Sequence, residues 1–245
     1  MSHTPSLIGF AFPYCAKAQL TVPQNHLSRR AKQHLPTVLL TLLSIVQALA
    51  LELMWSHLKE QELLYHWSFV SFLSWIQILA TLLGVLLIWL IYSTLVMRFR
   101  WVPSTGDSIF PFLIGIIEFA LIGSLGPDRF GQWFLLLGLV FGAMAWVSHV
   151  TMRRARLDGD NDVYFASMER ATLRDHYPTI AVVFGLELIG MYLWASGNQG
   201  IPALIALLIA ISVLGVQLWL SDYYWKLSLA ASGETAAADS EQRLD

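Results

Sequence analysis

Six long apolar stretches divide this sequence, and each is about as long as a membrane-spanning helix. A helix needs about 20 mainly apolar residues to cross the hydrocarbon core of a bilayer, which is roughly 30 Å thick. Turn-forming residues separate the stretches, as at Gly126-Pro127-Asp128. The predicted spans are residues 35–55, 69–97, 109–125, 133–151, 178–194 and 202–223. The expected fold is therefore an all-α integral membrane bundle of six transmembrane helices.

The composition favours a membrane protein over a soluble one. Charged residues make up 13% of the chain and hydrophobic residues 56%, whereas soluble domains carry about 25% charged residues. With a net charge of −2 and no basic stripe interleaved with aromatics, the chain is not expected to bind nucleic acid. The one cysteine, Cys15, excludes an intrachain disulfide and a cysteine-based metal site.

The distribution of lysine and arginine predicts the orientation. Of the 15 basic residues, 13 fall on the side that includes both ends of the chain, and only Lys59 and Arg129 fall on the other. Cytoplasmic loops carry the excess of these residues, so both termini are predicted to be cytoplasmic. Residues 1–34 then form a cytoplasmic N-terminal extension, 35–225 the transmembrane domain, and 226–245 a disordered cytoplasmic tail. The short loops favour a bacterial inner membrane.

The spans group into three helical hairpins. The first helix of each hairpin carries one glutamate: Glu52, Glu118 and Glu187. Internal repeats are common in membrane transporters, and their binding sites lie where the repeats meet. The pattern therefore favours three repeated hairpins packed around a polar interior.

These three glutamates are the strongest candidates for a functional site. A charged residue near the bilayer centre costs about 2.5–3.5 kcal/mol on insertion scales. Glu118 and Glu187 fall near the middle of their spans, and Glu52 lies in the outer third of the first span. No lysine or arginine lies at a comparable depth. Small residues at helical spacing, such as Ser44 and Ala48 before Glu52, predict that the acids point into the bundle.

Two interpretations of the glutamates stay open from the sequence. In the first, a small cation or protons pass along Glu118 and Glu187, with Glu52 as an outer vestibule acid, and protonation of the acids weakens cation transport at low pH. In the second, neutral glutamates hydrogen-bond to glutamines of neighbouring helices and fix the packing. The candidate glutamine partners are Gln47, Gln77 and Gln217.

The histidines predict no cofactor. His149 lies near the inner end of the fourth span, where it could relay protons or serve as an ordinary polar residue of the interface. Haem ligation would require a second histidine at similar depth in a neighbouring span. The other histidines near the spans lie at span ends: His34, His57, His66 and His176.

The loop over residues 152–177 resembles a calcium-binding loop in its spacing only. The acids at positions 1, 3, 5 and 12 of that loop are Asp158, Asp160, Asp162 and Glu169. Position 6 requires glycine for a sharp turn, and Val163 occupies it. The preferred interpretation is an acidic turn that caps a helix over residues 163–174, with Asp162 near the N-cap. No metal site is predicted.

The predicted function is passage or exchange of a small cation or proton by a multi-pass membrane protein. The alternative is a non-transporting scaffold or complex subunit, and a membrane-embedded enzyme acting on a lipid or quinone is less favoured. Zinc-protease, phosphate-loop and serine-hydrolase motifs are absent from the sequence, so no enzyme activity is expected. The expected partners are the lipid bilayer and the transported ion, and a homo-oligomer stays open.

Overall fold

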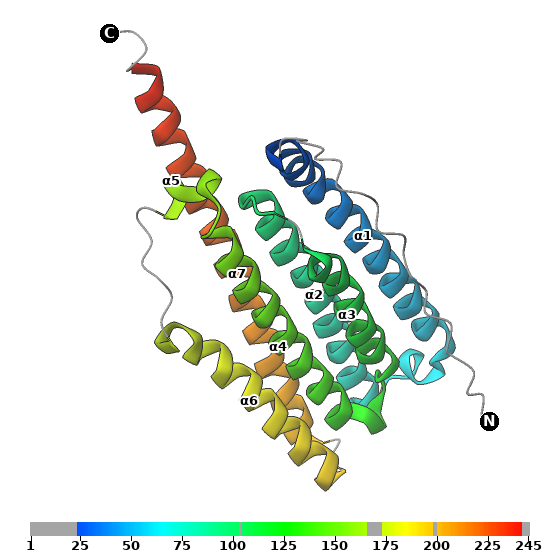
Figure 1. Cartoon of the computed structure of the whole chain (residues 1–245). Coiled ribbons are helices and arrows are strands. Elements are labelled where there is room, and N and C mark those ends of the chain that lie inside the picture. Colours follow the sequence, from blue (N-terminus) through cyan, green and yellow to red (C-terminus); the bar gives the residue numbers. More distant parts are fainter. Residues whose placement is uncertain (1–23, 103, 166–172, 198–199, 242–245) are drawn as a thin grey trace, which may run out of the picture.

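The computed structural model describes residues 24–102, 104–165, 173–197 and 200–241, and all regular structure in these segments is helical. Six long helices correspond to the six predicted spans: α1 (Gln24–Glu60), α2 (Phe69–Arg98), α3 (Thr105–Gly123), α4 (Phe130–Ala155), α6 (Leu173–Ser196) and α7 (Ile201–Glu241). Short helical segments lie between them: η1 (Glu62–Tyr65), η2 (Pro127–Arg129), η3 (Gly159–Asn161) and α5 (Asp162–Phe165). The long helices run side by side and alternate in direction (Figure 1).

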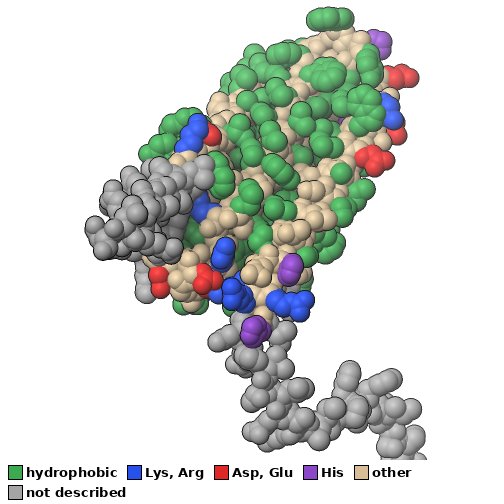
Figure 2. All heavy atoms as spheres, turned by 90° about the horizontal axis from the view of Figure 1, so that it is seen from above, with side chains coloured by type: hydrophobic (Ala, Val, Ile, Leu, Met, Phe, Trp, Pro, Cys, Tyr) green, Lys and Arg blue, Asp and Glu red, His purple; other side chains and the backbone are tan. Residues whose placement is uncertain are grey.

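The outer surface of the bundle is suited to lipid. By length and composition, six helices of the described chain can cross a membrane. Large apolar side chains are exposed on their outer faces, including Ile116, Phe184 and Trp219. On the face drawn in Figure 2, hydrophobic side chains form a broad band and charged side chains gather toward its ends. The chain is therefore a multi-pass membrane protein, and the prediction of a six-helix all-α bundle is confirmed.

The helices pack more between the predicted hairpins than within them. The most extensive contacts join α4 to α6, α2 to α7, and α1 to α3, whereas α6 and α7 of one hairpin touch much less. Further contacts join α3 to α4 and α1 to α2, so the helices close into a ring in the order α1, α3, α4, α6, α7, α2. The hairpins are thus interleaved, and Glu118 and Glu187 lie at different helix interfaces.

The interior differs from the polar centre expected from the sequence. It is filled mainly by apolar side chains, such as Ile114, Trp133 and Leu207, which are almost completely buried. Buried polar side chains are scattered among them, including Gln77 and Glu118 at 0% exposure. Helices in a bilayer associate through close packing as well as through polar contacts, so a repeat of this kind does not require a polar centre.

Most of the long helices extend beyond their predicted spans, and α1 and α7 do so by the largest margins. The first helix begins at Gln24, whereas the sequence placed residues 1–34 in an extension before the span. The last continues as helix to Glu241, where a disordered tail was expected from residue 226 onward. Alanine is the strongest helix former, so an alanine-rich segment that follows an established helix can prolong it despite its polar residues. Residues 1–23 and 242–245 lie outside the described residues.

One end of the bundle, called the basic end below, contains the start of α1 and the ends of α2 and α4 (Figure 1). Here the Lys32 ammonium group lies 2.6 Å from the Asp158 carboxylate and 3.1 Å from that of Asp160. The Asn161 side chain accepts from the Arg100 backbone N–H at 3.1 Å. The acidic turn thus ties α1 and the α2–α3 connection to the end of α4.

The turn at residues 158–162 can be compared with the acidic helix cap that the sequence predicted. The Asp158 side chain accepts from the backbone N–H of Asp160 and caps η3, and α5 begins at Asp162. An acidic turn before a helix, with Asp162 near the N-cap, was expected, and α5 does begin at Asp162, whereas Asp158 caps the preceding η3. Helix is described only as far as Phe165, and residues 166–172, with Glu169, lie outside the described residues.

Candidate functional site

Glu118 lies in a buried contact between α3 and α1. Its side chain has 0% exposure, and the Gln47 Nε2 group donates a hydrogen bond to its Oε2 atom at 3.0 Å. Gly115, about one turn earlier on α3, allows this approach, because a Cβ atom there would lie 2.6 Å from Cγ1 of Val46. The sequence predicted both Glu118 and Gln47 as site residues, and the structure brings them together.

The remaining polar atoms of this pair have no partner within the described residues. Glu118 Oε1 and Gln47 Oε1 are buried without a hydrogen bond there. None of the ion pairs formed in that part of the chain involves Glu118. An ionised carboxylate buried without a cation is costly, whereas the neutral acid can donate a proton in a hydrogen bond.

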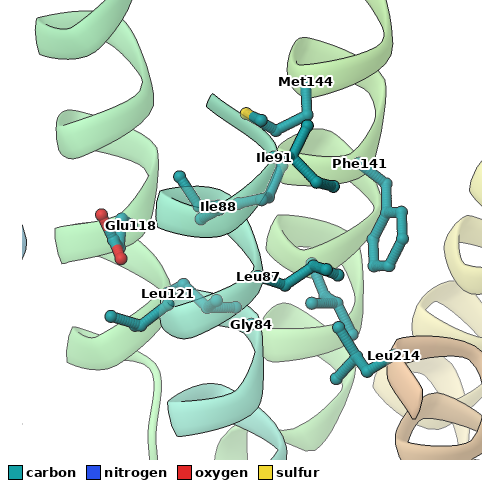
Figure 3. Close-up of a pocket in the computed structure, with 12 residues that line it drawn as sticks. Gly84, Leu87, Ile88, Ile91, Glu118, Leu121, Phe141, Met144 and Leu214 are labelled. Atoms are coloured by element: carbon teal, nitrogen blue, oxygen red, sulfur yellow. The ribbon is translucent and has the colours of Figure 1, made fainter. Parts of the chain in front are cut away.

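Glu118 also lines a cavity of about 30 Å³ at the centre of the bundle. The wall is built by α2, α3, α4 and α7, near the middle of the four spans, and Glu118 is the only polar side chain among the described residues that form it. Figure 3 shows Leu87 and Ile88 of α2 across this space from Phe141 and Met144 of α4. A cavity of this size has room for about one water molecule. The site is therefore one carboxyl group beside a small, otherwise apolar space.

Glu187 occupies a different interface, between α6 and α4. It is half-buried, and a Cβ atom on Gly138 of α4 would lie 2.7 Å from its Oε1 atom. Gly131 and Gly190 bring the same two helices together further along, since a Cβ at Gly131 would lie 2.5 Å from the Trp194 backbone nitrogen. We call this α4–α6 contact the glycine seam. Glu187 does not line the central cavity, so the structure does not join it to Glu118 in one site.

Glu52 does not point into the bundle as expected. It is exposed on α1, together with Ser44 and Ala48 of the same helical face. The buried face of α1 is instead formed by residues such as Val46 and Gln47. Both faces of this helix carry small or polar residues, so spacing alone did not identify the side that packs.

The other glutamines do not contact the glutamates as predicted. Gln77 is completely buried, but its Oε1 atom accepts from the Gly126 backbone N–H at 3.1 Å. Its backbone carbonyl accepts from Thr81, whose hydroxyl in turn accepts from the Trp133 indole at 2.9 Å. Gln77 thus bonds to the connection after α3, at the end of the bundle opposite the basic end, while its Nε2 group has no partner among the described residues. Gln217 is half-buried on α7.

Two histidines meet at the basic end of the glycine seam. The rings of His149 on α4 and His176 on α6 have centroids 5.1 Å apart and planes at 71°. His149 is exposed and His176 is half-buried. The sequence treated both as interfacial residues at span ends. The fourth predicted span ends and the fifth begins on the same side of the membrane. The sequence therefore indicated that the two histidines lie at a similar depth, but not that they meet.

A buried ion pair at the basic end was also missed by sequence reasoning. Arg154 of α4 lies 2.6 Å from Asp107 in the first turn of α3, and Asp107 is 2% exposed. The capping sequence at Ser104 and Asp107 was a visible signal for the helix start. The spacing of residues along the sequence does not show that Arg154, on another helix, is the partner of Asp107.

No family model, curated protein or solved structure matches the chain. Within the described residues, no three potential metal ligands of the His, Cys, Asp or Glu type cluster together.

Proposed function

We propose that this membrane protein takes up and releases protons through Glu118, as a proton channel or as a proton-coupled transporter. The proposal rests on the burial and the hydrogen bonding of Glu118. It is fully buried near the middle of a span, bound through one oxygen to Gln47, and its other oxygen has no partner in the described structure. Acidic residues in this position commonly mark ion or proton pathways.

The geometry favours a proton over a metal cation at Glu118. A bound Ca²⁺ or Mg²⁺ ion needs about six oxygen ligands, including several from protein or water. Glu118 is the one acid in the wall of the cavity, and the cavity has room for about one water molecule. A proton needs only the carboxyl group and a neighbouring water for transfer. The site therefore suits a proton better than Ca²⁺ or Mg²⁺.

Gln47 has a clear part in this proposal. Its amide group donates to Glu118 Oε2 and leaves Oε1 as the free oxygen. Gln47 thereby fixes the orientation of the carboxyl group, whose second oxygen accepts or donates the proton. Gln47 is a positioning residue in this scheme, since it carries no titratable proton.

The proposal includes an orientation of the protein in the membrane. The rule that cytoplasmic segments hold excess lysine and arginine places the basic end in the cytoplasm. The short connections between the helices favour a bacterial inner membrane. Proton movement would then run between the basic end and the opposite end, past the middle of the bundle where Glu118 lies.

The test is proton flux into proteoliposomes loaded with a pH-sensitive dye, driven by a potassium potential with valinomycin. Glu118→Gln keeps an oxygen that can accept from Gln47 but cannot titrate. Glu52→Gln is the matched control, because Glu52 is a span acid that is exposed on α1. We expect flux in the native protein and in the Glu52 variant, and its loss in the Glu118 variant. Equal flux in native protein and the Glu118 variant would overturn the proposal.

A structural role for the same pair is the second candidate. The Gln47–Glu118 hydrogen bond joins α1 to α3 and so suits a scaffold or complex subunit. This function predicts no flux from the native protein. It also predicts that removal of the hydrogen bond lowers only the melting temperature.

A further inference from the structure

The basic end of the glycine seam carries a pair of groups that the proposed proton site does not use. His149 and His176 come from different helices, and their ring centroids are 5.1 Å apart. Aromatic rings packed edge to face have centroid distances in the same range, so ring packing by itself accounts for this contact. Imidazole, however, is also the commonest metal-binding side chain, so the pair has a second chemical use.

The spacing of the rings fits one shared metal ion. Zinc is bound by histidine nitrogens at about 2.0–2.1 Å in a tetrahedral arrangement, which puts the centroids of two bound imidazoles about 5 Å apart. The observed separation is 5.1 Å. The rings meet edge to face, so a shared ion requires each ring to rotate about its Cβ–Cγ bond until one nitrogen faces the ion, and the exposure of His149 leaves its ring free of close packing.

We propose that His149 and His176 bind one divalent transition-metal ion of the Zn²⁺ type between α4 and α6. Two imidazoles supply two of four ligands, and water supplies the others at this exposed position. Zinc prefers nitrogen ligands, whereas Ca²⁺ and Mg²⁺ prefer oxygen, so the pair selects against the latter ions. Among the described side chains, exposed Arg153, one turn after His149 on α4, is a neighbouring cation that the bound ion must tolerate.

A bound ion would fasten the two helices of the seam. From the histidine pair, α4 and α6 continue past Gly142 beside Val183 and past Gly138 beside Glu187. A ligand that binds only the native arrangement stabilises it in proportion to the logarithm of ligand concentration over Kd. The site does not depend on the proton function of Glu118, and its test does not require transport.

The experiment is equilibrium dialysis of the full-length, untagged protein in detergent against ZnCl₂, with the bound zinc per chain measured. Native protein is compared with His149→Gln, His176→Gln and His66→Gln. His66 is an exposed histidine at the opposite end of the bundle and serves as the matched control. We expect each of the first two variants to lose the same bound zinc ion, and the His66 variant to retain it.

A second measurement separates loss of the site from loss of folding. Each variant is melted with and without ZnCl₂, and its melting temperature without metal shows whether the fold is intact. We expect zinc to raise the melting temperature of native protein and of the His66 variant, but not of either seam variant. Zinc binding that survives in one or both seam variants would overturn the proposal, because two separate surface histidines would then explain it.

Discussion

Arg154, the penultimate residue of α4, lies 2.6 Å from the carboxylate of Asp107 in the first turn of α3. The same carboxylate accepts from the Ser104 backbone N–H at 2.7 Å and from the Trp101 indole at 3.3 Å. Asp107 is therefore the N3 residue of a capping box and, at once, the acid of a pair between helices. It fixes where α3 begins and how α3 meets α4.

Replacement of Asp107 by Asn should lower the free energy of unfolding by about 2 kcal/mol, because charge-assisted hydrogen bonds are lost at a buried position. The loss should stay below the 3–5 kcal/mol typical of fully buried pairs, since the Arg154 side chain is 35% exposed and solvent screens it. Asp222→Asn breaks an exposed pair with Lys226 and should cost less than about 0.5 kcal/mol. Denaturation in detergent measures both. Equal losses from the two variants would contradict this ranking.

The glycine seam gives a steric prediction. A Cβ at Gly131 would lie 2.5 Å from the Trp194 backbone nitrogen, so α4 and α6 must separate in Gly131→Ala. Overpacking of this kind costs about 1–3 kcal/mol. At Gly142 the nearest atom would be 3.9 Å away, on Val183. Gly142→Ala should therefore leave the melting temperature nearly unchanged or raise it. A similar melting temperature for both alanine variants would show that the close contact at Gly131 is absent.

Glu52 and Glu118 should respond in opposite ways to an apolar substitution. Glu52 is exposed on α1 within a predicted span, a position where a carboxyl group that faces lipid costs free energy. Glu52→Leu should leave the melting temperature unchanged or increase it. Glu118→Leu should decrease it, because buried Gln47 loses its acceptor. Thermal melts in one detergent decide the matter, and a larger decrease for the Glu52 variant would indicate that Glu52 is covered in the native protein.

The sequence was sufficient to predict the helices because their signal is local. Twenty apolar residues in succession identify a span, and the turn at Gly126 marks where one helix ends. The structure places α2 at Phe69–Arg98, against a predicted span of 69–97. By contrast, α7 continues to Glu241 because helix propensity can act beyond the apolar stretch.

The candidate site was predictable only in part, because helix faces and partners are not local properties. Glu118 and Gln47 were both named, yet their pairing depends on the approach of α1 to α3 at Gly115. Glu52 was placed on an inward face because small residues accompany it, but those residues are exposed with it. The meeting of His149 with His176 depends on contact between two helices of different hairpins.

The Gln47–Glu118 hydrogen bond joins two membrane-spanning helices, α1 and α3. Interhelical hydrogen bonds in membrane proteins contribute about 0.6 kcal/mol on average and up to about 1.7 kcal/mol. Gln47→Leu and Glu118→Leu should each destabilise the protein, since each leaves the other polar group buried without its partner. In the double variant both groups become apolar, so the loss should be smaller than the sum of the single losses. Unfolding of all four proteins in the same detergent gives the coupling energy. Additive losses would mean that the two side chains do not interact in the native state, and Gln47 could not then position Glu118.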